Sequence, residues 1–204
     1  MGGLLALSRG IDRVNTLIGR GVAWLILLAI IVSAVNAIVR KVFSLSSNAW
    51  LELQWYLYGA AFMLAAAYTL LENEHIRIDV IYGRWSRRAQ HWIDLLGTLL
   101  FLLPFTGIMI YLVYPALRSS WRTGEISMNA GGLMIWPARA ILLAGFMLLF
   151  AQGISELIKK IAVMRRIIPD PNPHVSPHEA GLKEAGLMTA GLDRDNSSEP
   201  ENRA

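Results

Sequence analysis

The sequence predicts an all-α integral membrane protein with four transmembrane helices, and three observations support this class. Hydrophobic residues make up 54% of the 204 residues and charged residues only 17%, below the roughly 25% usual in soluble domains. The apolar residues gather in four stretches of roughly 20 residues, the length of helix that crosses a hydrocarbon core. These stretches are apolar on every face, whereas a soluble amphipathic helix keeps a polar face.

The predicted transmembrane spans are bounded by charged or turn-forming residues. They cover residues 21–43, 49–71, 93–117 and 133–160. Pro104 and Gly107 are expected to kink the third span. The fourth span is expected to open near Trp136 and Pro137, because proline is well tolerated in a first helical turn.

Two further helices are predicted at the membrane surface. In residues 4–20, apolar side chains recur at three- and four-residue spacing and the arginines lie elsewhere, which predicts an N-terminal amphipathic helix in the membrane plane. A slanted extension of the first span is an equally good interpretation. Residues 82–92 place Trp85 and Trp92 beside arginines, which predicts a short interfacial helix between spans 2 and 3.

The chain divides into a membrane domain, residues 1–166, and a tail, residues 167–204. The tail holds five of the eight prolines and has a net charge of −4, whereas the membrane domain has a net charge of +8. A charged, proline-containing tail with few apolar residues cannot bury a core, so it is predicted to be disordered.

The basic residues predict the topology. They concentrate before span 1, between spans 2 and 3, and after span 4. Because lysine and arginine collect in cytoplasmic segments, both termini and the tail are predicted to be cytoplasmic. The same rule explains the basic balance without a nucleic-acid partner.

Several kinds of chemistry find no support in the sequence. The chain has no cysteine, which excludes thiolate metal sites and cysteine nucleophiles. Gly131 and Gly132 are not followed by the lysine of a phosphate loop. No metal-spaced cluster and no nucleophile–base arrangement is recognisable, so neither an enzyme nor a cofactor is predicted.

Charged residues at the ends of spans are the first candidates for function in a membrane protein. Glu52 opens span 2 and Arg139 opens span 4. They are expected at similar depth, where they could form an ion pair between the two spans. The alternative is that each extends separately to the interface.

Three segments together resemble a known family. They are Trp50-Leu51-Glu52, the His75, Arg77 and Asp79 pattern after span 2, and the stretch 125–133 that includes Asn129 and leads to Trp136. The chain is similar over residues 10–165 to the small membrane subunit (Q subunit, DctQ-like) of tripartite ATP-independent periplasmic (TRAP) transporters.

The resemblance implies a multi-pass protein of the bacterial inner membrane, surrounded by membrane lipids and bound to a large multi-span permease subunit. A periplasmic substrate-binding protein would deliver an organic acid or similar small solute, and an ion gradient, usually sodium, would drive import. The small subunit would act as a scaffold.

The family pattern carries over to particular positions of this chain as structural or interface residues. They are Trp50, Glu52, His75, Arg77 and Asp79, and Asn129 and Trp136 are further structural or interface candidates. The loops 44–48 and 119–133, with the charges of Arg118, Arg122 and Glu125, are expected to dock the binding protein.

Two alternatives belong to other functional classes. A haem-carrying membrane anchor of a redox complex would need two facing axial histidines, but His75 and His91 lie within one short connection. A self-sufficient homo-oligomeric transporter would need charges deep in a span, where this chain is apolar.

Overall fold

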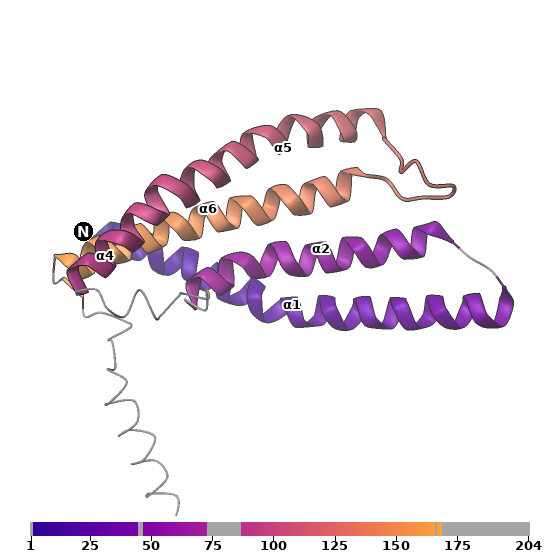
Figure 1. The fold of residues 1–204 in the computed structure, drawn as a ribbon, viewed down its shortest axis with the longest axis horizontal. Coiled ribbons are helices and arrows are strands. Elements are labelled where there is room, and N and C mark those ends of the chain that lie inside the picture. Colours follow the sequence, from indigo (N-terminus) through magenta and orange to yellow (C-terminus); the bar gives the residue numbers. More distant parts are fainter. Residues whose placement is uncertain (1, 45–46, 73–86, 166, 169–204) are drawn as a thin grey trace, which may run out of the picture. The chain divides into compact units, whose positions relative to one another are not determined.

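The computed structural model describes residues 2–44, 47–72, 87–165 and 167–168. The chain divides into residues 1–168 and 169–204, and all described helices belong to the first unit. Beyond the helices, the described residues contain one antiparallel bridge, between Ile126 and Met134. The all-α class is therefore confirmed for this part of the chain (Figure 1). The prediction of a disordered tail falls, from residue 169 onward, outside the described residues.

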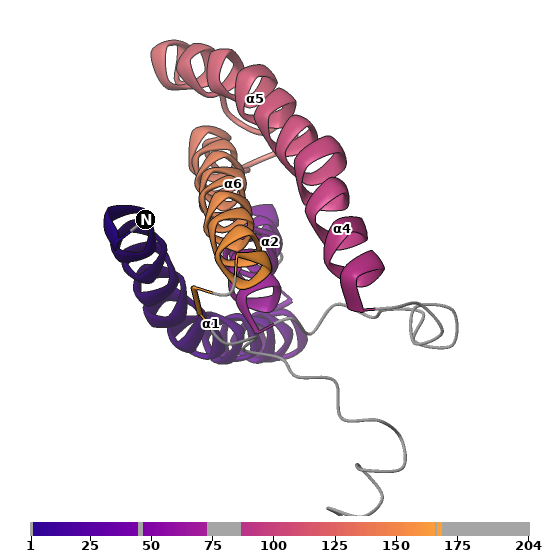
Figure 2. The same cartoon turned by 90° about the vertical axis from the view of Figure 1, so that its left-hand side faces the viewer.

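Helix α1, Gly2–Phe43, is a single helix of 42 residues. The predicted amphipathic segment 4–20 forms its first half, without a break before the apolar second half. No proline interrupts the segment, so nothing in it removes a backbone donor from the helix. Figure 2 shows that α1 curves along its length. This continuity agrees with the interpretation of residues 4–20 as an extension of the first span.

The third predicted span lies within a longer helical rod. It consists of α4 (Arg87–Gly97), a π-helical turn (Thr98–Leu102) and α5 (Leu103–Thr123). The wide turn immediately precedes Pro104, whose missing N–H disturbs the α-helical ladder. Residues 87–92 of the predicted interfacial helix form the first turns of this rod, and residues 82–86 lie outside the described residues.

Helix α6, Trp136–Met164, packs against each of the other long helices. It contacts α1, α2 (Asn48–Leu71) and α5, and α1 also packs along α2. Figure 1 shows α6 between α5 and α2. A Cβ on Gly145 of α6 would lie 2.7 Å from Met63 Cβ and 2.9 Å from the Met63 carbonyl oxygen on α2. A small residue at this crossing lets the two backbones approach closely, as in other membrane helix pairs.

The two ends of this unit differ in what they hold. We call the end with the 124–135 loop and the start of α2 the hairpin end. We call the end with the start of α1 and the end of α6 the N-terminal end. Figure 1 shows these groups at opposite ends of the long helices.

Three helical segments within the described residues are long and apolar enough to cross a membrane: Gly2–Phe43, Ala89–Thr123 and Trp136–Met164. At most 28% of the most apolar window of each is buried within the protein, so large apolar surfaces remain uncovered. Helix α2 is not among these three segments. Its 24 residues begin with polar Asn48, Glu52 and Gln54 and contain several tyrosines.

Candidate functional site: the hairpin clamp

The connection between α5 and α6 is a short hairpin. Gly124 ends α5 with a φ of +62°, the left-handed conformation that glycine adopts readily after a helix. The Ile135 N–H donates to Glu125 O at 3.0 Å, and the Ser127 N–H donates to Leu133 O at 2.9 Å. At the tip, the Gly132 N–H donates to Asn129 O at 2.9 Å. The backbone of the loop is therefore internally ordered.

The carboxylate of Glu52 fastens this hairpin to the first turns of α2. Glu52 Oε1 accepts hydrogen bonds from the Ser127 hydroxyl and from Asn129 Nδ2, the latter at 2.8 Å. Glu52 Oε2 accepts the Leu133 backbone N–H at 2.6 Å. We call Glu52 and these three donors the hairpin clamp. Because the donors lie on both arms of the loop, one side chain holds both arms. Charge-assisted hydrogen bonds of this kind are about twice as strong as neutral ones.

Further contacts of α2 support the clamp. Asn48 Nδ2 donates to Ala130 O at 2.9 Å, and the Tyr56 hydroxyl donates to Met134 O at 3.0 Å. Gly132 fills a position with no room for a side chain, because a Cβ there would lie 2.6 Å from Ser127 Cβ and 2.8 Å from Glu52 Oε1. The close fit makes glycine a requirement of the clamp.

Arg139 does not pair with Glu52, so the ion pair considered between spans 2 and 4 does not form. Arg139 Nη1 instead contacts Glu125 Oε2 at 2.7 Å and donates to Ala116 O at 3.0 Å. The partner lies in the hairpin because the loop folds back beside α6. Glu52 meanwhile accepts its hydrogen bonds from the loop.

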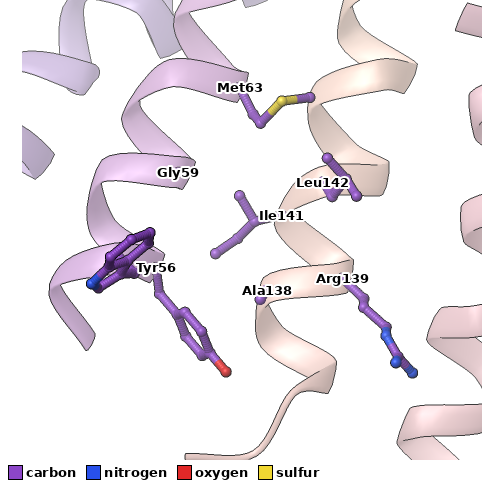
Figure 3. Close-up of a pocket in the computed structure, with 8 residues that line it drawn as sticks. Tyr56, Gly59, Met63, Ala138, Arg139, Ile141 and Leu142 are labelled. Atoms are coloured by element: carbon purple, nitrogen blue, oxygen red, sulfur yellow. The ribbon is translucent and has the colours of Figure 1, made fainter. Parts of the chain in front are cut away.

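An apolar pocket lies beneath the clamp, between α2 and α6, with a volume of about 220 Å³. Its lining residues are Trp55, Tyr56, Gly59, Met63, Ala138, Arg139, Ile141 and Leu142. Figure 3 shows the Arg139 guanidinium pointing away from Tyr56. The guanidinium is engaged with Glu125. The pocket therefore offers mainly apolar contact.

The remaining candidates fall into three groups. Trp136 packs edge-to-face on Trp121, with ring centroids 4.4 Å apart, and so links α5 to α6. Trp50, Arg118 and Arg122 are exposed at the hairpin end. His75, Arg77 and Asp79 lie outside the described residues.

Sequence reasoning missed a second polar cluster, at the N-terminal end. There α1 and α6 meet through buried side chains: Ser8 Oγ lies 2.7 Å from Ser155 Oγ, and Asn15 Nδ2 donates to Gln152 Oε1 at 2.7 Å. Asp12 accepts from Ser155 Oγ at 2.7 Å and from Gln152 Nε2 at 3.0 Å. We call these five residues the N-terminal seam.

A sequence signal for the seam exists. Ser8, Asp12 and Asn15 repeat at three- and four-residue spacing, as do Gln152, Ser155 and Lys159, so each set shares one helix face. Lys159 extends the contact, with Nζ 3.2 Å from Asp12 Oδ2. What the spacing does not reveal is that the two faces meet each other.

Long apolar helices with largely uncovered outward faces define an integral membrane protein. No cluster of three or more histidine, aspartate, glutamate or cysteine side chains suited to a metal occurs in the described ranges.

A family model described as "Tripartite ATP-independent periplasmic transporters, DctQ component" matches residues 14–163. The chain therefore belongs to this family, the small membrane component of TRAP transporters, which is a transporter component and not an enzyme family. The resemblance found in the sequence is confirmed. Neither curated proteins nor solved structures gave a match.

Proposed function

We propose that this chain is the small permease subunit of a TRAP-type secondary transporter in a bacterial inner membrane, and that it acts as a scaffold for the large subunit. The family match and the uncovered apolar faces of the long helices carry this proposal. A scaffold in lipid needs such faces toward both lipid and partner. The imported solute is proposed to be an organic acid or similar small molecule, with sodium as the coupling ion.

Recovery of partners tests the scaffold role. The tagged chain is purified in mild detergent from its native membrane, and co-purifying proteins are identified by mass spectrometry. A large multi-span permease in about equal amount is expected. Recovery of the chain alone, as a homo-oligomer, would contradict the assignment.

The proposed topology has four spans, with both termini in the cytoplasm. Helix α2 supplies the fourth crossing: 24 residues at roughly 1.5 Å each give about 36 Å, and α2 packs along α1.

Because the chain has no cysteine, single cysteines report orientation cleanly. A cysteine at Ser47 is expected to react with an impermeant maleimide from the periplasm, and one at Glu72 only after the membrane is opened. Equal reaction of both in intact cells would contradict the four-span topology.

The hairpin end is proposed to dock the periplasmic substrate-binding protein. The support is geometric, because the clamp fastens this internally hydrogen-bonded loop to the start of α2. Reversal of the charges at Arg118, Arg122 and Glu125 is expected to lower uptake, and unchanged uptake would argue against docking here.

On the opposite side, His75, Arg77 and Asp79 are proposed to fix the turn between spans 2 and 3. Alanine at all three is expected to reduce complex assembly.

A further inference from the structure

A second cavity lies beside the N-terminal seam, between the first half of α1 and α6. Figure 2 shows the first half of α1, drawn in indigo, beside α6. The volume of the cavity is about 490 Å³, within the roughly 300–1,000 Å³ typical of ligand sites. We call it the seam groove. Most of its wall consists of small or apolar residues, among them Ala6, Leu7, Gly10, Val14, Leu148 and Ala151.

The seam groove opens at the protein surface along α1. Leu7 and Val14 in its wall are 54% and 50% exposed, although both are large and apolar. A Cβ added to Gly10 would meet no heavy atom within 4 Å beyond the neighbouring backbone of its own helix. The groove therefore has room for an apolar chain that covers these side chains.

The polar side chain in the wall of the groove is Asn15, and a series of hydrogen bonds fixes how its amide is turned. Asp12 accepts from Gln152 Nε2, so Gln152 Oε1 faces Asn15 and accepts from its Nδ2. The Asn15 Oδ1 atom is left as an acceptor. It is buried and accepts no hydrogen bond from any described residue. Because a buried acceptor without a donor is costly, the wall favours a ligand that donates a hydrogen bond.

Two arginines of α1 flank the groove. Arg9 follows Ala6 by three residues and Arg13 follows Gly10 by three, and residues at this spacing are neighbours on a helix surface. Both arginines are exposed, and neither forms an ion pair within the described part of the chain. Asp12, the carboxylate between them in sequence, is held within the N-terminal seam. The edge of the groove therefore favours an anion.

We propose that the seam groove binds one anionic phospholipid whose head group carries a hydroxyl, of the phosphatidylglycerol class. Its phosphodiester lies at Arg9 and Arg13, a head-group hydroxyl donates to Asn15 Oδ1, and an acyl chain covers Leu7 and Val14. A neighbouring helix could also fill an apolar groove. Exposed arginines beside an apolar helix face, however, are the arrangement that favours anionic lipid head groups. The inference goes beyond the proposed function, because it requires only that the chain is an integral membrane protein.

Native mass spectrometry with two lipids tests the chemistry of the ligand. The tagged full chain, purified in mild detergent with the proteins that accompany it, is depleted of lipid and titrated with dioleoylphosphatidylglycerol. The matched lipid is dioleoylphosphatidylmethanol, which keeps the negative phosphodiester but has no hydroxyl. We expect one tightly held phosphatidylglycerol per chain and roughly fivefold weaker binding of phosphatidylmethanol, because Asn15 Oδ1 then gains no donor. Equal affinities would overturn the proposal.

Two variants test whether the lipid lies in the groove. R9A/R13A is expected to weaken phosphatidylglycerol binding about twenty-five-fold, since each basic side chain near an anionic lipid contributes roughly fivefold. G10L fills the groove from a position with open space and is expected to abolish the tight site. The matched control R118A/R122A removes two exposed arginines at the hairpin end and should bind like the wild type. Wild-type binding by both R9A/R13A and G10L would refute the location.

Thermal unfolding in the same detergent separates loss of binding from loss of the fold. Without added lipid, R9A/R13A is expected to unfold at the wild-type midpoint, because both side chains are exposed. Added phosphatidylglycerol should raise the midpoint of the wild type but not of G10L, since a ligand of the folded state stabilises it. If G10L instead lowers the recovery of a membrane partner and leaves the lipid titration unchanged, the groove holds a protein helix and the lipid proposal fails. The scaffold role would then stand.

Discussion

The hairpin clamp and the N-terminal seam both hold segments of the chain together, but they use different hydrogen-bonding groups. Each fixes one end of an apolar helix bundle with polar groups. In the clamp, one carboxylate accepts hydrogen bonds from a backbone N–H, a hydroxyl and an amide of a partly exposed loop. In the seam, amides and hydroxyls on two helices pair with each other, and Gln152 and Asn15 are 0% and 2% exposed.

The difference follows from what each end must hold. The loop offers one backbone N–H and two side-chain donors, so a single carboxylate can fasten it to α2. Two helices have satisfied backbones, so only side chains on facing surfaces can join them, and each buried polar group needs a partner. Between the two ends, α2 and α6 approach each other closely at small residues such as Gly145. Four experiments test this difference between the two ends and the middle of the bundle.

The largest effect is expected at the middle of the bundle. G145A places a Cβ 2.7 Å from Met63 Cβ and 2.9 Å from a backbone oxygen, so α2 and α6 must move apart. Overpacking of this kind costs about 3 kcal/mol, which corresponds to a fall of roughly 6–12 °C in thermal midpoint for a chain of this size. Thermal unfolding in detergent measures it. G59A on α2 is the control, because an added Cβ there would meet no heavy atom within 4 Å beyond the neighbouring backbone of its own helix. Equal midpoints for the two variants would refute the packing argument.

Gln152→Leu should loosen the N-terminal seam alone. It leaves Asn15 Nδ2 without its acceptor and removes a donor from Asp12, at a cost of about 2 kcal/mol for buried unpaired groups. Nitroxide labels on cysteines introduced at Leu4 and Met147 report the distance between the two helices. We expect the distance distribution to broaden in Q152L and to keep its wild-type width in the clamp variant E52Q. Broadening in both would mean that the ends are coupled.

Glu52→Gln should loosen the hairpin alone. Glutamine keeps one acceptor oxygen. Its NH₂ group then faces a donor whose hydrogen bond the carboxylate had accepted. We expect faster motion of a nitroxide label at position 128, measured by its line shape, because the loop loses a hydrogen-bond acceptor. E72Q, an exposed carboxylate at the other end of α2, should leave the line shape unchanged. A rigid hairpin in E52Q would show that the backbone hydrogen bonds alone suffice.

The smallest effect is expected at Glu125 and Arg139. Their side chains are 41% and 29% exposed, and solvent screens such a pair to less than about 1 kcal/mol. A double-mutant cycle of E125Q and R139Q, read by thermal unfolding at low and high salt, measures the coupling. A coupling well above this value, or one insensitive to salt, would place the pair among the main contacts of the hairpin end.

The sequence predicted the helices better than the contacts between them. Apolar length placed α2 and α6 within a few residues, and Trp136-Pro137 marked the start of α6. The continuity of α1 was left undecided, because residues 4–20 carry a helical pattern that suits either a separate helix or an extension.

The two sites show why the remainder escaped sequence analysis. Glu52 stood out as a charge at the start of an apolar run, but its partners lie about 75 to 81 residues away in a loop whose path no periodicity defines. The pairing of Arg139 with Glu125, which neither of the two alternatives for Arg139 included, escaped for the same reason. Ser8 and Asn15 were part of an amphipathic pattern whose polar face suits water as well as another helix. Only the crossing of α1 and α6 decides between them.

Two consecutive lysines on α6 have a mechanical consequence. Lys159 Nζ lies 2.5 Å from Glu156 and 3.2 Å from Asp12 of α1, while Lys160 Nζ lies 2.5 Å from Asp94 of α4. Adjacent residues of a helix point about 100° apart, so one turn of α6 reaches two separate helices. A sideways load on α1 from a moving neighbour would pass through this turn to α4 and to the rod that continues into α5. The last turns of α6 thus join α1, α4 and α6 through ion pairs, so a displacement of one of these helices strains its contacts with the others.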